Sequence, residues 1–325
     1  MENIRWGIIG PGKIARSFAN DLQLVEDGEI TAVASRSIER SQEFATEYDV
    51  AHIFDSYDAL FNSDEVDVVY IATPHVFHRD LAIRAMKHGK HVLCEKPLGI
   101  NRTEVMEMID VAKAHKVFFM EALWTRFNPT INKVKELADQ GVLGELAYVN
   151  ADFAFYALDR DKHSRLMNLD LAGGTLLDIG IYPVFLAYVF LGIPNEIKAV
   201  SNFNEAGTEI QTSILFNYPK AQAILNSAFT HNSRMSAEIS GSKGQVTLAP
   251  RFHETQGYTL LKSNELETFE LPTQGRGYYY EIQEVHQCIR NKKTESERWT
   301  FQDSLNLIGL LDDIREITGV RFPFE

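Results

Sequence analysis

Cysteine is nearly absent from this sequence: Cys94 and Cys288 are the only two in 325 residues. Two cysteines provide neither a disulfide framework nor a metal-binding cluster, so a reducing, cytoplasmic environment is expected. The histidines show no H-E-x-x-H or Cys/His spacing, and no G-x-S-x-G motif marks a nucleophilic serine. The sequence therefore favours neither a metalloenzyme nor a serine hydrolase.

Basic residues are the minority charge, with 32 Lys and Arg against 45 Asp and Glu and a formal net charge of −13. This balance argues against nucleic acid or an anionic membrane as the main partner. Long apolar runs are also lacking, because the most apolar stretch, residues 179–193, is interrupted by Gly180 and Pro183. It is too short to span a bilayer and is predicted to be a buried helix. A first strand that begins almost at residue 1 leaves no room for a secretory leader.

What is present is an ordinary globular composition, 45% hydrophobic and 24% charged, in a chain long enough for two domains. The first feature is an apolar run, Ile4–Ile9, that ends abruptly in Gly10-Pro11-Gly12. A helical pattern follows at once, with Ile14, Phe18 and Leu22 four residues apart. The order is therefore strand, glycine turn and helix.

This turn reads G-x-G-x-x-A and ends at Ala15. In the dinucleotide-binding fingerprint the first glycine permits the tight turn, the second lets a pyrophosphate approach the backbone, and the small third residue lets helix and strand pack closely. The helix N-terminus then offers N–H groups and a favourable dipole to the anion. The alternative is a tight turn that binds no ligand. The expected cofactor contacts are Gly10, Pro11, Gly12, Lys13 and Ile14.

Strands and helices alternate through the first third of the chain, which is typical of a doubly wound parallel sheet of the Rossmann type. The expected strands are 4–9, 29–35, 52–54, 66–72, 91–94 and 117–120. A helix is expected around Ile14, Phe18 and Leu22, a second after Ser37 as its N-cap, a third over 78–88, and a fourth through 115 that opens at Asn101, which has capping-box spacing with Glu104. The rhythm changes near Trp124, so we predict a dinucleotide-binding domain over 1–122 and a second domain over 123–325.

The second domain is predicted to be an open antiparallel sheet with helices on one face. Most of residues 146–156 and 196–269 read as alternating strands, and helices are expected at 129–139, 176–191, 279–290 and 302–317. We expect the uncovered face to carry apolar side chains and to pair two subunits into a homodimer. Ile214, Phe216, Ile224 and Phe229 are examples of apolar residues for that face, in a register that the sequence does not fix.

The end of the second strand predicts which nicotinamide cofactor binds. NAD-specific folds usually place Asp or Glu there, whereas this strand ends in Ser35-Arg36, with Arg40 one turn further on. Ser35 can hydrogen-bond a ribose 2′-phosphate, and Arg36 and Arg40 can neutralise it. We therefore expect NADP rather than NAD. The alternative is a solvated basic start of the next helix.

Three further motifs resemble one enzyme family. They are Ala72-Thr73-Pro74 with His78, the segment C-E-K-P-L-G at 94–99, and Gly173-Gly174-Thr175 with Asp178 and Tyr182. Together with the glycine turn, they resemble the Gfo/Idh/MocA oxidoreductases over essentially the whole chain. The stretches 120–129 (MEALWTRFNP) and 177–183 (LDIGIYP) resemble the branch of dimeric dihydrodiol dehydrogenases and NADP-dependent D-xylose dehydrogenases.

The resemblance implies that Lys96 and Tyr182 are catalytic. Lys96 follows an apolar strand, at the sheet edge where open parallel sheets bind ligands. Most of the wider family has histidine where Tyr182 stands. A tyrosine of ordinary pKa, about 10, matches neutral pH poorly as a proton carrier. A lysine cation ~4 Å away at an effective dielectric of ~20 would favour the phenolate by up to ~4 kcal/mol, which is sufficient to bring its pKa near neutrality.

The resemblance implies roles for other residues, each with a structural alternative. Asp178, four residues before Tyr182, either orients Lys96 or substrate or only complements a helix dipole. Further cofactor contacts are expected at Thr73, Pro74, His75, His78, Glu95, Lys96, Trp124 and Arg126. Substrate contacts are expected at Phe153, Phe155 and Arg165. The alternatives are structural. The histidines would be hydrogen-bonding residues, Lys96 would pair with Glu95, and Tyr182 would be buried in an apolar helix with its hydroxyl bonded to a backbone group. Trp124 and Arg126 would belong to interdomain packing, and Phe153 and Phe155 to aromatic core.

The sequence therefore predicts an NADP-dependent oxidoreductase that transfers a hydride between the nicotinamide and a secondary alcohol of a sugar, polyol or trans-dihydrodiol. Tyr182 would handle the hydroxyl proton, and Lys96 would polarise the oxygen. Two alternatives remain: an NAD-linked inositol or sugar-derivative dehydrogenase, and a non-catalytic NADP-binding sensor or regulatory protein.

Overall fold

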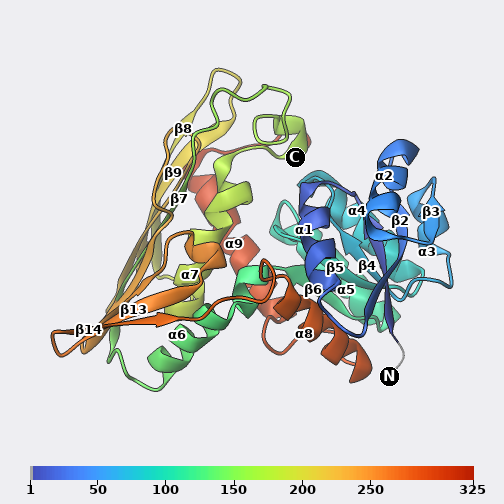
Figure 1. The fold of residues 1–325 in the computed structure, drawn as a ribbon. Helices are drawn as coiled ribbons and strands as arrows, with labels where there is room; N and C mark the ends of the chain where they lie inside the picture. The colour runs from blue at the N-terminus through green and yellow to red at the C-terminus, as the bar shows by residue number, and fades with distance from the viewer. Residues whose placement is uncertain (1–2) are drawn as a thin grey trace. The chain divides into compact units, whose positions relative to one another are not determined.

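A computed structural model describes residues 3–325 of the chain (Figure 1). The chain forms two compact units. The first runs through Phe127 and also includes Gln274–Leu305, and the second consists of Asn128–Thr273 and Asn306–Glu325. The sequence prediction placed all of 123–325 in the second domain. The difference arises because a pattern along the chain marks where the rhythm changes but does not show that a later segment returns to the first unit.

The first unit contains a six-stranded sheet in which every pairing is parallel. Its order is β3-β2-β1-β4-β5-β6, so the direction of winding reverses between β1 and β4. Ligands bind at such a reversal, beyond the carboxyl ends of the strands. The strands are β1 (Ile4–Ile9), β2 (Gly28–Ala34), β3 (His52–Phe54), β4 (Val68–Ile71), β5 (His91–Glu95) and β6 (Phe119–Ala122). This arrangement confirms the predicted Rossmann sheet.

Local capping explains where several helices of the first unit begin. Ser37 accepts a hydrogen bond from the Arg40 N–H, and Asn101 accepts one from the Glu104 N–H, as the sequence predicted for both. The short helix α3 was not predicted, because five residues show no helical period. The helices are α1 (Lys13–Leu22), α2 (Ile38–Tyr48), α3 (Tyr57–Phe61), α4 (His78–Lys87), α5 (Arg102–His115) and α8 (Tyr279–Arg290), with 3₁₀ turns η1 (His75–Phe77) and η2 (Trp124–Phe127).

The second unit contains an eight-stranded sheet in the order β14-β13-β12-β11-β7-β10-β9-β8. Neighbouring strands are antiparallel except β7 and β10, which are parallel because a long connection containing a helix separates them. The predicted sheet is thus confirmed as mostly antiparallel. Its strands are β7 (Leu146–Ala154), β8 (Glu196–Phe203), β9 (Glu209–Asn217), β10 (Gln222–Ala228), β11 (Ala237–Gly241), β12 (Gly244–Leu248), β13 (Gly257–Lys262) and β14 (Glu265–Glu270).

Helices cover one face of this sheet, as predicted. Figure 1 shows α6 (Pro129–Asp139) and α7 (Ile181–Leu191) on the same side of the strands. The last helix, α9 (Phe301–Thr318), begins in the first unit and continues into the second. The apolar segment Leu169–Leu191 is long enough to cross a bilayer, but 83% of its most apolar part is buried inside the protein. That burial agrees with the prediction of a core helix.

The prediction of which side chains lie on the uncovered face was partly wrong. Ile214, Phe216 and Phe229 are at most 3% exposed and lie in the core, whereas Ile224 is 48% exposed. The pairing of Ile224 with Leu215 in the ladder sets the face of each strand, and residues one position away point to the core. The sequence could not fix this register, since several of these strands carry apolar residues at both parities.

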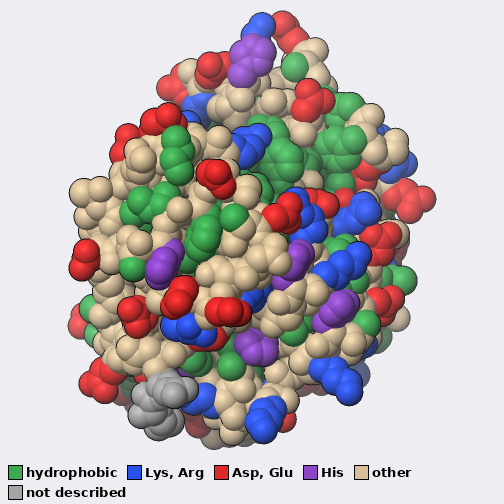
Figure 2. All heavy atoms as spheres, turned by 90° about the vertical axis from the view of Figure 1, so that its right-hand side faces the viewer, with side chains coloured by type: hydrophobic (Ala, Val, Ile, Leu, Met, Phe, Trp, Pro, Cys, Tyr) green, Lys and Arg blue, Asp and Glu red, His purple; other side chains and the backbone are tan. Residues whose placement is uncertain are grey.

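Surface charge follows the composition. On the face drawn in Figure 2, basic and acidic side chains are interspersed, and histidines lie among them. Both signs of charge are therefore present on this face, as expected from 32 basic and 45 acidic residues.

Candidate active site

The glycine turn lies between β1 and α1 at the carboxyl edge of the parallel sheet. Gly10 has φ +78°, and a Cβ atom there would lie 2.8 Å from the Ala72 carbonyl oxygen, so only glycine fits. A Cβ on Gly12 would meet nothing closer than the Gly10 oxygen at 3.9 Å, which leaves that backbone open. Gly12 is also the N-cap of α1, where no side chain makes a capping hydrogen bond. This turn has the two properties that a pyrophosphate site needs.

The end of β2 presents the three residues predicted to read the cofactor's ribose. Ser35 is 9% exposed and its Oγ accepts from the Ser37 N–H at 3.2 Å. Arg36 and Arg40 are exposed, and the Arg36 guanidinium lies 5.3 Å from the centre of the Phe77 ring. Such a cation–π contact holds the charge in place at the sheet edge.

His78, in the segment after β4, connects the loop that follows β4 with the loop that follows β5. His78 is fully buried, with Nδ1 2.9 Å from the Pro97 carbonyl oxygen and Nε2 2.8 Å from the Thr73 carbonyl oxygen. Burial lowers the pKa of His78, and the two carbonyl groups act in the opposite direction. His75 lies beside it, with ring centres 5.7 Å apart. His78 therefore ties the β4 loop to the loop that carries Lys96.

The Lys96 loop is fixed on both flanks. Glu95 accepts from the Tyr70 hydroxyl at 2.5 Å and from the Lys96 N–H at 3.2 Å. Burial raises the pKa of Tyr70 well above its ordinary value, so its hydroxyl is a donor here. Beyond the cis peptide bond before Pro97, the Leu98 N–H donates to Glu121 at 3.0 Å. The backbone on either side of Lys96 is thus anchored by buried carboxyl groups.

Trp124 and Arg126 follow β6 in the 3₁₀ turn η2, within the first unit. Trp124 is 4% exposed and stacks on Tyr278, with ring centres 4.7 Å apart and planes 7° from parallel. Because Tyr278 belongs to the same unit, this stacking is packing within the first unit and not the interdomain packing named as the alternative for Trp124.

These residues of the first unit fit a dinucleotide. The glycine turn leaves room for a pyrophosphate, and Ser35 and Arg36 offer a hydroxyl and a cation for a 2′-phosphate. Thr73 Oγ1 is buried and has no hydrogen-bond partner among residues 3–325, and a ribose hydroxyl would satisfy it. The fold thus brings most of the predicted cofactor residues to one edge.

In the second unit, Asp178 lies in a π-helical turn, η4 (Leu176–Gly180), that leads directly into α7. Its Oδ1 atom binds Arg165 Nη1 at 2.8 Å, and the Asp178 side chain is 10% exposed. The pairing joins a predicted catalytic residue to a predicted substrate residue. π-Helical turns are frequent at functional sites, and this one was not predicted from the sequence.

Tyr182 belongs to a buried aromatic cluster. It is 6% exposed, and its ring centre lies 5.6 Å from Phe153 and 5.2 Å from His253. Phe153 and His253 stack at 4.3 Å. The ring centres of Phe155 and Phe229 lie 5.2 Å apart. This packing agrees with the alternative that Phe155 is an aromatic core residue. Tyr182, Phe153 and His253 are hereafter called the aromatic cluster.

Sequence reasoning missed several residues at these sites. His253 comes from a short 3₁₀ turn, η5 (Phe252–Glu254), about seventy residues from Tyr182, and carried no motif. Glu121 is buried and binds the Lys96 loop, Ser304 and the Trp299 indole N–H. An acidic residue in an otherwise apolar strand was the available signal for Glu121, since a buried carboxyl group requires partners.

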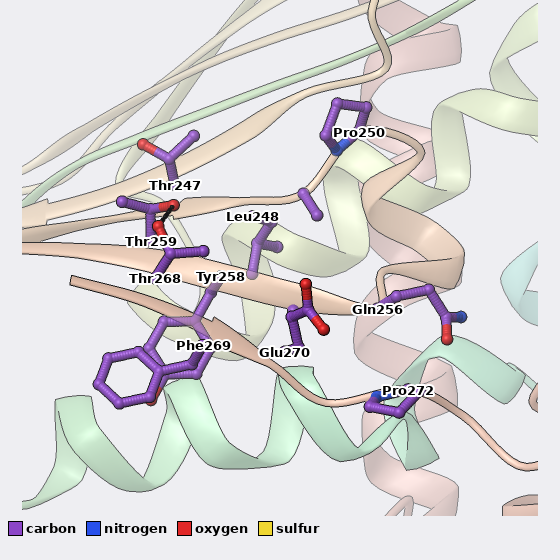
Figure 3. A pocket seen from close by; sticks show the side chains of 12 residues that line it. Thr247, Leu248, Pro250, Gln256, Tyr258, Thr259, Thr268, Phe269, Glu270 and Pro272 are labelled. Atoms are coloured by element: carbon purple, nitrogen blue, oxygen red, sulfur yellow. Dashed lines mark hydrogen bonds between the residues drawn. The ribbon is translucent and has the colours of Figure 1, made fainter.

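A separate cavity of about 400 Å³ opens beside the ends of β12, β13 and β14 (Figure 3). Its lining includes Leu248, Pro250, Gln256, Glu270 and Pro272. None of its lining residues is a predicted site residue, and the volume alone does not indicate a ligand.

Comparison with known proteins agrees with the geometry. The family model described as "Oxidoreductase family, NAD-binding Rossmann fold" of Gfo/Idh/MocA type matches residues 4–123, and the Gfo/Idh/MocA C-terminal domain matches residues 131–247. The trans-1,2-dihydrobenzene-1,2-diol dehydrogenase of Mus musculus is 34% identical over 98% of both chains. The scyllo-inositol 2-dehydrogenase (NADP(+)) IolU of Bacillus subtilis is 33% identical over 98% of both.

Solved structures show the same architecture. The 3-ketoreductase KijD10 from Actinomadura kijaniata, solved in complex with NADP and TDP-benzene, superposes with a TM-score of 0.88 at 28% identity over 98% of both chains. The aldose-aldose oxidoreductase from Caulobacter crescentus has a TM-score of 0.89 at 24% identity and shares the fold. The predicted nicotinamide-dependent oxidoreductase class is thereby confirmed: the chain belongs to the Gfo/Idh/MocA family of oxidoreductases.

Proposed function

We propose that the protein is an NADP-dependent dehydrogenase acting on a secondary alcohol of a sugar, polyol or trans-dihydrodiol. One observation carries this proposal: the open glycine turn, the Ser35-Arg36 pair and the anchored Lys96 loop all follow strands β1, β2 and β5 at one edge of the parallel sheet. That edge is where such folds bind a dinucleotide.

The predicted cofactor residues would bind different parts of the dinucleotide. The turn residues Gly10, Pro11, Gly12, Lys13 and Ile14 hold the pyrophosphate, and Ser35, Arg36 and Arg40 hold the 2′-phosphate. Thr73, Pro74, His75, His78, Glu95, Trp124 and Arg126 form or support the ribose and nicotinamide end. When bound, the nicotinamide donates or accepts the hydride.

Lys96 and Tyr182 carry out the proton chemistry. In the oxidation direction the Tyr182 phenolate accepts the proton of the substrate hydroxyl. The Lys96 ammonium polarises that oxygen and favours the phenolate. One observation supports the role of Lys96: the Lys96 N–H donates to Glu95 and the Leu98 N–H donates to Glu121, which fixes the backbone on both sides of the lysine. The role of Tyr182 rests on the resemblance of its segment to the family.

The ion pair made by Asp178, four residues before Tyr182, favours an uncharged substrate. The Arg165 guanidinium is paired with the Asp178 carboxylate at 2.8 Å, so the pair adds no net charge to attract a phosphate. The aromatic cluster supplies an apolar wall, and Asp178 supplies hydrogen-bond acceptors for hydroxyl groups. Neutral diols, sugars and inositols match this combination better than sugar phosphates. A dihydrodiol and an inositol are named as substrates of two relatives.

The test follows absorbance at 340 nm after NADP is mixed with the protein and a panel of sugars, inositols and trans-dihydrodiols. Tyr182→Phe should lower kcat by about 10²- to 10⁴-fold, the usual share of a general acid–base group. Tyr258→Phe is the matched control, because Tyr258 is another buried tyrosine of the second unit, 4% exposed. A Tyr182→Phe variant with normal kcat would remove Tyr182 from proton transfer.

The same assay separates the competing functions. A protein that binds NADPH tightly but turns over no member of the panel is a sensor or regulatory subunit. A higher kcat/KM with NAD than with NADP identifies an NAD-linked inositol or sugar-derivative dehydrogenase and contradicts the assignment of Ser35, Arg36 and Arg40.

The protein further acts in the cytoplasm as a homodimer that pairs through the uncovered face of its sheet. Val200 is 72% exposed, Ile224 48% and Leu266 71%, and all three lie on that face. Exposed apolar side chains spread over one sheet face support self-association. Both cysteines are free and buried, which suits a reducing compartment.

A further inference from the structure

A buried carboxylate lies against the start of the helix that carries Asp178 and Tyr182. Glu209, the first residue of β9, is 1% exposed. Its Oε1 atom accepts from the Thr175 hydroxyl at 2.6 Å and the Thr212 hydroxyl at 2.7 Å, and its Oε2 atom accepts from the Leu176 N–H at 2.9 Å. Two of these three donors are the consecutive residues at which η4 begins.

The surrounding chain is shaped to allow this approach. Gly174 has φ +132°, and a Cβ atom there would lie 3.1 Å from Glu209 Oε2, so glycine is required. A Cβ on Gly180 would lie 2.9 Å from the Ser227 Oγ on β10. That same hydroxyl is 2.8 Å from Thr175 Oγ1. The small residues of the G-G-T and D-I-G segments therefore let the helix start press directly onto β9 and β10.

Glu209, which lies in β9, caps the N-terminus of this helical segment. Thr175 is the N-cap residue of η4, but its side chain makes no capping hydrogen bond. The Glu209 carboxylate instead takes an otherwise unpaired N–H of the first turn, where a negative charge is also favoured by the helix dipole. From Leu176 the chain continues without a break through Asp178 to Tyr182. The direction and register of this rigid segment thus depend on where Glu209 holds its first residues.

We propose that Glu209 is a positioning residue for the reaction. It fixes the first turn of the helix so that Tyr182 meets the reacting oxygen in the productive geometry, and this inference rests on the proposed role of Tyr182. Because only 1% of its surface is exposed, Glu209 would act through the helix and not by touching substrate or cofactor. Positioning errors of this kind have large effects, since a misplacement of about 1 Å from a remote mutation can cost roughly 10²-fold in rate.

Two substitutions at Glu209 give graded effects. Glu209→Met removes all three acceptor contacts, and we expect kcat to fall by roughly 10²-fold. Glu209→Gln keeps one oxygen for the Leu176 N–H, and the two hydroxyls can rotate to accept from its amide, so its loss should be smaller. The KM for NADP should stay unchanged in both, because the predicted cofactor residues belong to the other unit.

Substitutions at Thr175 provide a second route if Glu209→Met fails to fold. Thr175→Val deletes the hydroxyl that donates to Glu209, and Thr175→Ser restores it, so the serine variant should recover kcat. Thr31→Val is the matched control. Thr31 is likewise a buried threonine whose hydroxyl donates at 2.6 Å, to the Glu65 carbonyl, but it lies in β2. It should leave kcat unchanged.

A double-mutant cycle separates positioning from general loss of structure. If Glu209 acts through Tyr182, Glu209→Gln should cost little further activity in a Tyr182→Phe background. Equal fractional losses in both backgrounds would mean a merely structural role and would overturn the inference, as would normal kcat in Glu209→Gln and Thr175→Val. A Tyr182→Phe enzyme with normal kcat would instead overturn the proposed function, so the two failures are distinguishable.

Discussion

Cofactor choice rests on Arg36, and replacing it by alanine tests the reasoning directly. The Arg36 guanidinium lies 5.3 Å from the centre of the Phe77 ring, directly after β2. There it can bind the 2′-phosphate that distinguishes NADP from NAD. The substitution removes that charge without disturbing the buried Ser35.

The expected effect follows from exposure. Hydrogen bonds to charged groups contribute about 1.5–3 kcal/mol. Because Arg36 is exposed, we take the lower end of this range, and about 1.4 kcal/mol corresponds to tenfold. Arg36→Ala should therefore lower kcat/KM for NADP by roughly tenfold. It should leave NAD nearly unaffected, since NAD carries no 2′-phosphate.

Initial rates measured at 340 nm with each cofactor give kcat/KM for NADP and kcat/KM for NAD. Phe77→Leu should show a smaller loss with NADP, about two- to fivefold, because a cation–π contact of about 0.5–1 kcal/mol is removed while the charge remains. Arg79→Ala is the control, since Arg79 binds Glu107 at 2.8 Å. If Arg36→Ala keeps its full preference for NADP, the phosphate is recognised elsewhere and the argument from β2 is wrong.

Two further predictions concern stability and assembly. His286 accepts from the Trp6 indole N–H at 2.9 Å and pairs with Asp27, so it must be neutral, and burial lowers its pKa below the ordinary 6.5. As pH falls, the imidazole of His286 is therefore protonated in the unfolded chain before it is protonated in the folded one. The contribution of neutral His286 to the free energy of unfolding is complete above pH 6.5 and decreases below it, by at most about 1.4 kcal/mol per pH unit. Urea unfolding from pH 7.5 to 5 should show a shallower decline for His286→Gln, and equal slopes would contradict this assignment. Separately, Ile224→Arg should convert the proposed dimer to a monomer in light scattering, whereas Ile53→Arg, 40% exposed on β3, should not; a dimer that survives Ile224→Arg pairs through another surface.

The sequence was most informative where function depends on local order. The glycine turn, the Ser35-Arg36 pair and the Lys96 segment each follow a strand directly, and parallel strands bring their ends to one edge. The types of most helices and strands, and most of their boundaries, could be predicted for the same reason. The hydrophobic period and the capping residues that define them depend on residues only a few positions apart. Even the Asn101 cap was predicted, because its partner Glu104 is three residues away.

Tertiary structure decided whatever depends on partners distant in the chain. The hydrogen bond from Thr175 to Glu209 spans 34 residues, and that from Trp299 to Glu121 spans 178. His253 reaches Tyr182 only through the pairing of β11 to β13 with the rest of the sheet. The parallel pairing of β7 with β10 and the return of 274–305 to the first unit are of the same kind. Periodicity specifies which side of an element is buried, but the identity of what it is buried against is set only when the whole chain packs.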